Sequence, residues 1–219
     1  RSLSILSPDS AGLRWHSSDA NVTQYEIWFK TSAVDSWQNV DTVGKQTGYL
    51  FDSLNTTDSI YCAKLIAIDS CAANRSRFSQ LHCAVQLKGT PGNLANHLRW
   101  HPYVGMNKPT YQVQKQKAGN WQSLASTSDT NFTDTSNLAC HVTETYRIMS
   151  ISENGADTAY SDTIKLAPYD TIAPPTPQLN FASANVQDEV EVQWNWQQDT
   201  DQKYFEIWRD QGNGNFQLL

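Results

Sequence analysis

Gln24-Tyr25-Glu26-Ile27-Trp28 occurs three times in related form along this chain. The other copies are Thr110-Tyr111-Gln112-Val113-Gln114 and Tyr204-Phe205-Glu206-Ile207-Trp208. In each copy the first aromatic residue and the aliphatic residue two positions later share one face of a β-strand. Aromatic residues recur at similar distances on both sides: Trp15, Trp100 and Trp194 upstream, and Trp37, Trp121 and Phe216 downstream. The spacing predicts three copies of one β module, roughly ninety residues apart.

The composition excludes several classes of function. The chain has 219 residues and a net charge of -6, and it carries no basic stripe that would bind nucleic acid. Lys and Arg are not clustered as they are in segments that bind anionic membranes. The sequence also lacks the apolar run of a membrane-spanning helix, and its N-terminus lacks the apolar region of a signal peptide. We therefore expect any targeting segment to lie outside this sequence.

Alternating apolar residues and turn clusters predict short strands at intervals of about ten residues. In the first copy the predicted strands are 13–15, 24–30, 37–43, 49–51, 59–69 and 78–87. No segment has a convincing helical period, so the predicted class is all-β, with tandem immunoglobulin-like β-sandwiches of which the third is incomplete. Its three or four strands are too few for a sandwich, so we expect a fragment of a longer chain or a module that another chain completes.

The repeats also predict the domain boundaries. The first module is expected at residues 1–88 and the second at 89–167, with a first strand that is missing or shared. Residues 168–219 are expected to hold a proline-rich linker and the N-terminal part of the third module. Because so few residues separate the first two modules, they should abut with little hinge, whereas the prolines form a semi-rigid spacer.

These patterns resemble fibronectin type III modules. The buried tryptophan of the second strand and the Tyr-x-Val/Ile of the third strand are followed by the sixth-strand pattern Tyr61-x-x-x-Leu65-x-Ala67-x-Asp69. The resemblance implies that Tyr61 is a corner tyrosine, whose hydroxyl bonds back to the backbone. The second repeat departs from the pattern, because the same alignment places Glu144 where that tyrosine belongs.

Shorter strings, including Asp69-Ser70-Cys71 and His82-Cys83, resemble the tandem modules of very large cell-surface proteins of Bacteroidota. These proteins are exported by the type IX secretion system and are often described as gliding-motility-associated. The resemblance implies an exported, surface-exposed stalk or adhesin spacer that is not an enzyme and needs no cofactor. The implied partners are other modules of the same polypeptide, the export machinery, surface proteins or glycans.

The four cysteines lack the CxxC spacing of zinc sites. If the last two strands of the first module form a hairpin that turns near Ala73, Cys62 lies opposite residue 83 or 84, which predicts a Cys62–Cys83 disulfide. The alternative is a pair of reduced thiols. Cys71 and Cys140 are expected at distant ends of the two modules and should not pair with each other.

Twelve of the sixteen aspartates precede Ser or Thr. One explanation is turn chemistry, because these side chains bond nearby backbone at strand ends. The resemblance to Bacteroidota proteins implies another, because Asp-Ser/Thr before a small or aliphatic residue resembles their O-glycosylation signal. The candidates are Ser10, Thr42, Ser53, Ser59, Thr158, Thr163 and Thr171.

Three tryptophans are the remaining candidate binding feature: Trp28 and Trp208 are expected on the outer faces of their sheets, and Trp196 at the mouth of a loop. An exposed indole can stack on a sugar ring, so the alternative function is a carbohydrate-binding or accessory module of a secreted polysaccharide-degrading enzyme. Cross-strand packing or a contact between modules explains the same residues without a ligand. No nucleophile elbow, glycine-rich oxyanion loop or glycosidase carboxylate pair was found, so no catalytic or metal residues are assigned.

Overall fold

The computed structural model describes residues 1–17, 20–32, 34–71, 74–187, 189–197 and 203–219. In these ranges the ordered elements are all β-strands, and none of the described residues belongs to a helix that could cross a membrane. The contacts divide the chain into two compact units, Arg1–Pro168 and Tyr169–Leu219. The first unit contains both of the first two modules, and we describe each unit separately.

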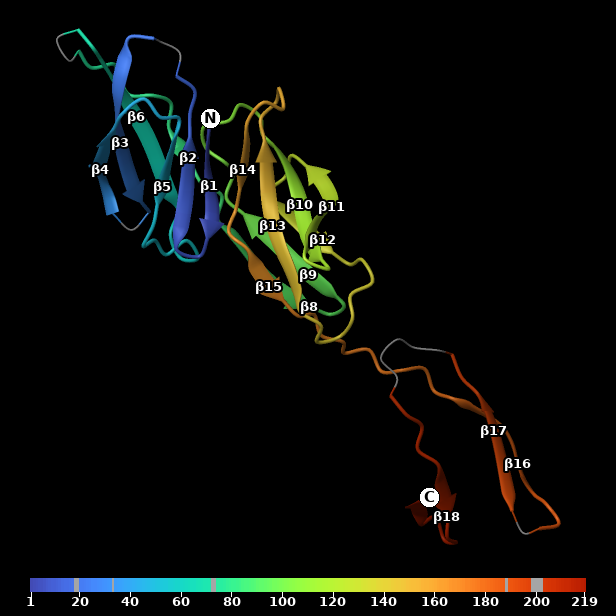
Figure 1. Cartoon of the computed structure of the whole chain (residues 1–219). Helices are drawn as coiled ribbons and strands as arrows, with labels where there is room; N and C mark the ends of the chain where they lie inside the picture. Colours follow the sequence, from blue (N-terminus) through green and yellow to red (C-terminus); the bar gives the residue numbers. More distant parts are fainter. Residues whose placement is uncertain (18–19, 33, 72–73, 188, 198–202) are drawn as a thin grey trace. The chain divides into compact units, whose positions relative to one another are not determined.

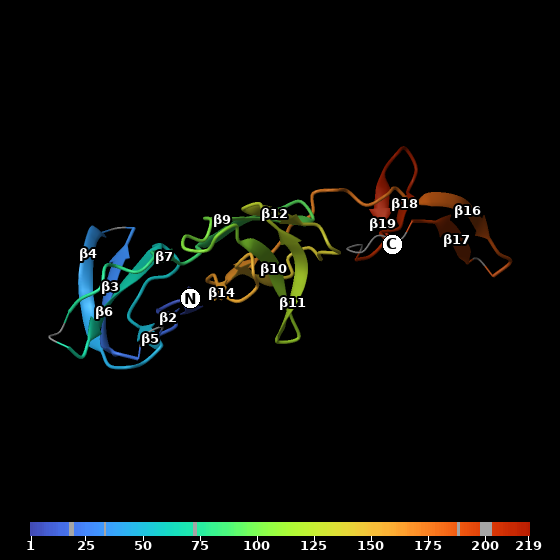
Figure 2. The same ribbon diagram turned by 90° about the horizontal axis from the view of Figure 1, so that it is seen from above.

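The first module is a sandwich of two antiparallel sheets (Figures 1 and 2). One sheet has the order β1 (Ser2–Ser7), β2 (Ser10–Arg14), β5 (Gly48–Phe51). The other has the order β4 (Val34–Val43), β3 (Val22–Thr31), β6 (Tyr61–Asp69), β7 (His82–Cys83). The repeated string lies on β3, where Tyr25, Ile27 and Phe29 point into the core because successive side chains alternate between the two faces.

The second module repeats this order of strands. Its smaller sheet is β12 (Asn131–Asp134), β9 (Ala95–Trp100), β8 (Leu87–Gly92). Its larger sheet is β11 (Asn120–Thr127), β10 (Thr110–Lys117), β13 (Glu144–Ile151), β14 (Thr158–Tyr160), and β15 (Ile164–Leu166) also pairs with β13. In both cores the upstream tryptophan meets the aromatic of the string edge to face, with ring centroids 5.4 Å apart for Trp15 and Tyr25 and 5.6 Å apart for Trp100 and Tyr111.

The boundary between the first two modules corrects one prediction. Leu87 does not end a strand of the first module; it begins β8, the first strand of the second, which the sequence pattern suggested was missing or shared. A Cβ on Gly89 would lie 2.9 Å from the backbone carbonyl oxygen of His97, and 2.8 Å from the side chains of Ile164 and Leu166, so this strand favours a residue without a side chain. Glycine and proline interrupt the alternation of apolar and polar residues, so the sequence pattern did not predict this strand. The first strand of the chain, β1, was also not predicted.

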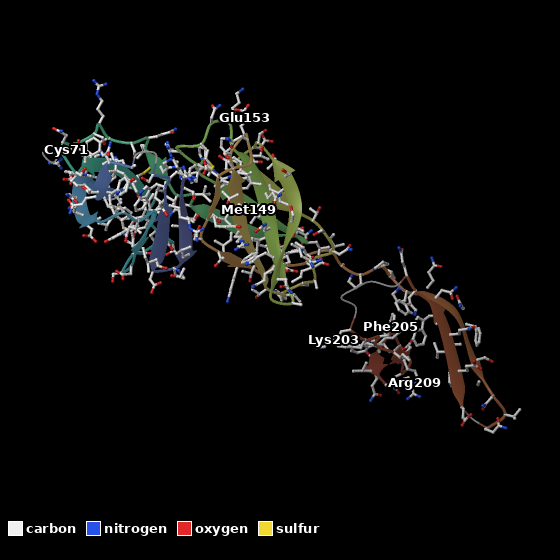
Figure 3. The ribbon with its side chains drawn as sticks, turned by 45° about the horizontal axis from the view of Figure 1, so that its top comes forward. Cys71, Met149, Glu153, Lys203, Phe205 and Arg209 are labelled. Carbon is white, nitrogen blue, oxygen red and sulfur yellow. A yellow bond between two sulfur atoms is a disulfide. The ribbon has the colours of Figure 1, made fainter. Side chains whose placement is uncertain are left out.

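The second unit contains two hairpins. One is formed by β16 (Gln178–Ala184) and β17 (Val190–Asn195), and the other by β18 (Trp208–Asp210) and β19 (Phe216–Leu218). Their apolar side chains surround an open groove of about 450 Å³, which is lined by Val192, Phe205 and Trp208 among others. Figure 3 shows Phe205 and Arg209 in this unit. In the third copy of the string, regular pairing begins only at its last residue, Trp208.

Candidate functional site

The first two modules meet at a buried junction, where β1, β7 and residues 84–86 of the first module lie against residues 103–105 and β14 of the second. In Figure 1, β1 and β14 lie side by side, and the backbone N–H of Tyr160 donates to Oγ of Ser4 over 3.2 Å. Gln86 reaches back to the carbonyl of Thr57 through Nε2 over 2.9 Å. Ala84, Val85 and Gln86 are buried, so the connecting segment is itself part of the packed interior.

Tyr103 is the centre of this junction. Its side chain is buried, and its hydroxyl accepts the backbone N–H of Leu3 over 2.8 Å. The same hydroxyl lies 2.9 Å from Nδ1 of His82, and because it accepts from Leu3 we assign its proton to the bond with His82. The backbone N–H of Tyr103 in turn donates to the hydroxyl of Tyr111 over 3.0 Å. One side chain therefore connects β1, β7 and the core of the second module.

A second strand-like contact lies beside Tyr103. Cys83 pairs with Val104 as an antiparallel bridge, in which the Cys83 N–H donates to the Val104 carbonyl over 3.0 Å. The next residue, Gly105, has a φ of 106°, and a Cβ there would lie 2.4 Å from the carbonyl oxygen of Leu81. Only glycine fits both the backbone conformation and the close approach of the two modules.

Protonation of two buried groups near the junction changes the stability of the protein in opposite directions. Burial lowers the pKa of His82 from 6.5 to about 4, so its contribution to stability is complete above pH 6.5 and is lost as the pH falls toward 4. Burial raises the pKa of Asp162, whose Oδ1 accepts the Leu87 N–H over 2.8 Å, from 3.8 to about 6. Stability is therefore gained as Asp162 takes up a proton between pH 6 and pH 4. The two contributions oppose each other in one pH window.

Single substitutions should separate these two contributions. Relative to the wild type, His82→Gln should gain stability as the pH falls from 6.5 to 4, and Asp162→Asn should lose it. A tenfold change in proton affinity is worth about 1.4 kcal/mol, so differences of roughly 2–3 kcal/mol should develop. Denaturant unfolding at pH 4, 5, 6 and 7 measures them. A difference from the wild type that stays constant across this range would show that the group does not titrate as its burial requires.

A disulfide lies next to the junction. Cys62 on β6 faces Cys83 on β7, and the structure joins them, with Cα atoms 4.0 Å apart, as the hairpin geometry predicted. Cys71 and Cys140 are free, and Cys71 lies on a loop at the end of the first sandwich (Figure 3). Because β7 has only two residues, the disulfide holds His82 and Cys83 in place for the contacts with Tyr103 and Val104.

Removal of this disulfide should destabilise the first module. The bridge closes a loop with a sequence separation of 21 residues, and crosslinks of this size contribute about 3 kcal/mol. We expect the double variant Cys62→Ser/Cys83→Ser to lower the unfolding free energy by about this amount. Reductant should lower the unfolding free energy of the wild type by a similar amount. Cys71→Ser is the matched control, because Cys71 is free and exposed. Equal stability of all variants in the presence and absence of reductant would contradict the prediction.

The structure places the three candidate binding tryptophans in different surroundings. Trp28 is half-buried: its Nε1 donates to Glu26 over 3.1 Å, and its ring meets Phe78 edge to face at 5.5 Å. Trp196 is 46% exposed and contacts Phe205 at 5.4 Å. Trp208 is 52% exposed and repeats the bond to a glutamate, here Glu206, over 3.1 Å. Trp28 thus takes part in cross-strand packing, and the other two lie on the second unit.

None of the seven O-glycosylation candidates is fully buried. Five are exposed: Thr42, Ser53, Thr158, Thr163 and Thr171. Ser10 and Ser59 are half-buried, and the hydroxyl of Ser10 is bonded to that of Ser7. Accessibility therefore permits modification at five sites, and glycosylation stays a prediction. Within the described residues no three His, Cys, Asp or Glu side chains are grouped as metal ligands.

A buried polar cluster in the second module was missed by the sequence analysis. In the first module Phe29 stacks on Phe51 at 4.1 Å and on Tyr61 at 5.3 Å. The strand registers place charged residues at the same three positions of the second module: Lys115, Asp134 and Glu144. Two alanines of the first module, Ala11 and Ala63, are likewise replaced by Asn96 and Tyr146. We call this end of each sandwich core the pole: it is aromatic in the first module and polar in the second.

The polar cluster is closely bonded. Lys115 and Asp134 are each 1% exposed, and Lys115 Nζ lies 3.0 Å from Asp134 Oδ2. The Tyr146 hydroxyl donates to the same oxygen over 2.7 Å, and Ser136 donates to Oδ1 through both its backbone N–H and its hydroxyl. Burial alone would raise the pKa of Asp134, but these donors and Lys115 outweigh it and lower the pKa. Burial also raises the pKa of Tyr146.

Comparison with known proteins adds little to this picture. No family model and no curated protein matches the chain. Two of the similar solved structures are the FN1–FN3 domains of chicken CNTN1 and a segment of two fibronectin type III domains from chicken tenascin. The first is 14% identical with a TM-score of 0.33, covering 99% of this chain and 82% of that one. The second is 15% identical with a TM-score of 0.32, covering 74% and 93%. Likenesses this low carry no argument about function.

The strand pairing itself defines the class of protein. Each of the first two modules packs a three-stranded sheet against a larger antiparallel sheet in the same order. This is the architecture of immunoglobulin-like sandwiches, which fibronectin type III domains share. The corner tyrosine is also present, because the Tyr61 hydroxyl accepts the backbone N–H of Asn55 over 2.7 Å. The chain is therefore an all-β protein with tandem sandwiches of this kind.

Proposed function

We propose that the chain is a non-catalytic structural segment of a large exported cell-surface protein, in which the first two modules act as one stiff link of a stalk or adhesin spacer. The observation that carries the proposal is the Tyr103 junction, where buried hydrogen bonds join the two sandwiches. Inter-domain contacts are commonly small and polar, which permits relative motion. A junction with a buried connecting segment instead limits bending, which is the property that a spacer requires.

Two further features support export. The Cys62–Cys83 disulfide is of a type that forms and persists in oxidising compartments. Five of the Asp-Ser/Thr sites are exposed, as an O-glycosylated surface protein requires. We propose export through the type IX secretion system of a Bacteroidota host on the resemblance described above.

In the native host, protease treatment of intact cells should release peptides of this chain. Release only after lysis would overturn the cell-surface assignment.

Relaxation measurements test the stiff link directly. If the first two modules move as one body, ¹⁵N relaxation of the full chain should give both the same rotational correlation time. Two distinct correlation times would overturn the proposal.

Free glycans should also leave the resonances of Trp28 unchanged, because its ring is already packed against Phe78. A glycan-dependent shift that is lost in Trp28→Ala would instead favour a carbohydrate-binding module.

Residues 168–219 are proposed to be a linker and the N-terminal part of a third module. The two hairpins carry the equivalents of the first strands, including the Trp194 and Phe205 rings at 5.5 Å. Large apolar side chains on these hairpins are exposed, among them Leu179 at 66% and Val190 at 64%. In the first module β5 pairs with the equivalent of β17, which is β2, and β6 pairs with β3, the strand of the repeated string. Strands of that kind would complete the third sandwich.

A further inference from the structure

We propose that Lys115 and Asp134 of the second module form an intramolecular amide bond between Nζ and Cγ. The inference goes beyond the proposed structural role and does not depend on it. A buried ion pair is often no more stabilising than apolar side chains of similar volume. The first module fills the same positions with Phe29, Phe51 and Tyr61, so the fold does not need charges there.

The geometry brings an amine and a carboxyl group together away from water. Lys115 Nζ lies 3.0 Å from Asp134 Oδ2, and both residues are 1% exposed. Groups held at such a distance react with effective molarities on the order of 10⁵–10⁸ M. Burial by itself favours the neutral amine and acid, because desolvation disfavours charged forms, but the hydrogen bonds to Asp134 outweigh this effect and keep the carboxylate ionised. Condensation therefore requires that one proton first pass from Lys115 to Asp134.

Neighbouring donors polarise the carboxyl group. The Ser136 N–H, at 2.9 Å, and its hydroxyl, at 2.5 Å, converge on Asp134 Oδ1, where negative charge develops in a tetrahedral intermediate. The Tyr146 hydroxyl donates to Oδ2 over 2.7 Å, on the oxygen next to the amine. Oδ1 is therefore the oxygen that is stabilised, and Oδ2 is the oxygen that leaves. The same donors also hold the carboxylate ionised, so condensation should follow folding slowly.

The carboxylate of Glu144 is the proton carrier in the proposed reaction. Its Oε1 lies 3.9 Å from Lys115 Nζ, and its side chain is 21% exposed. The reaction balances without another reagent. One proton passes from the Lys115 ammonium to the Asp134 carboxylate, the freed amine attacks Cγ, and an N–C bond forms. Glu144 moves the second proton from nitrogen to the departing oxygen, the C–O bond breaks, and one water leaves. No electrons are exchanged with an oxidant or reductant.

The mass of the purified full chain tests this bond. Measured in reductant, so that the disulfide does not contribute, it should be lower than the sequence mass by one water. Trypsin should then fail to cut after Lys115, and residues 100–117 should be recovered joined to residues 118–147. An unmodified mass overturns the proposal. A deficit of one ammonia overturns the assignment to Asp134, because the partner of the lysine would then be a side-chain amide.

Single substitutions test the roles of Lys115 and Glu144 in the proposed reaction. Lys115→Arg should restore the full mass, because a guanidinium keeps the charge and is a poor nucleophile. Lys88→Arg is the matched control, because Lys88 also lies near a carboxylate, 3.9 Å from Asp58, but on the surface, and this variant should keep the deficit. Glu144→Gln should restore the full mass in a chain that remains folded. A persistent deficit in Glu144→Gln would remove Glu144 from the mechanism.

Discussion

Asp134→Ala is expected to lower the unfolding free energy of the second module by about 3–5 kcal/mol, because it leaves the Lys115 ammonium buried without its partner. The Tyr146 hydroxyl and Ser136 lose their acceptor in the same substitution. Denaturant unfolding, followed by residue-resolved NMR signals of each module, measures the effect separately in the two sandwiches.

A multiple variant supplies the control for this prediction. Lys115→Phe, Asp134→Phe, Glu144→Tyr, Asn96→Ala and Tyr146→Ala together transfer the aromatic pole of the first module into the second. We expect this variant to recover most of the stability that Asp134→Ala loses, because both poles occupy equivalent positions. If Asp134→Ala unfolds no more readily than the wild type, the cluster contributes nothing to stability and our reading of it is wrong.

In chains whose Lys115–Asp134 amide bond has not formed, acid should weaken the same cluster. The pKa of Asp134 is lowered in the folded state, so its stabilising contribution is present above its ordinary pKa and is lost as the pH falls through the lowered value. The second module should therefore lose stability in strong acid, below the window in which His82 and Asp162 titrate. The multiple variant has no carboxylate at these positions and should not show this loss.

Much of the fold could be predicted because core residues alternate regularly. The string around Tyr25 and Ile27, its tryptophan and the corner Tyr61 all lie on central strands, where burial on one face imposes a period of two. The Cys62–Cys83 pairing followed from the same hairpin register. β8 was missed because Gly89 and Pro91 interrupt the pattern, although the strand is paired along its length.

The sites were harder to predict, because they depend on residues that are distant in the sequence. Lys115 and Asp134 have the appearance of surface residues in any local window, and only the strand registers bring them together inside a core. Alignment of Glu144 with the corner tyrosine was the one available signal that this pole differs from the first. Tyr103 gave no signal, because its partners Leu3 and His82 belong to the other module.

Tyr103→Ala is expected to release the two modules from each other. The substitution removes a buried aromatic side chain, which costs about 3–5 kcal/mol in a packed interior. It also leaves the Leu3 N–H without its acceptor and His82 Nδ1 without its partner. Tyr103 also belongs to the hydrophobic core of the second module, so part of the loss falls on that core, whereas the core of the first module stays intact. The rotational correlation times of the modules, equal in the wild type, should then separate.

Tyr103→Phe separates the loss of the hydroxyl hydrogen bonds from the loss of the aromatic ring. The ring remains, and only the hydroxyl is removed, so the expected cost is the 1–3 kcal/mol of an unsatisfied buried N–H. We expect the modules of this variant to keep a common correlation time but to separate at lower denaturant concentration than the wild type. Should Tyr103→Ala still tumble as one body, the stiffness of the junction would have to come from the Cys83–Val104 bridge and the β1–β14 contact. The tyrosine would then be a packing residue, and the bending of the stalk would be set by backbone pairing.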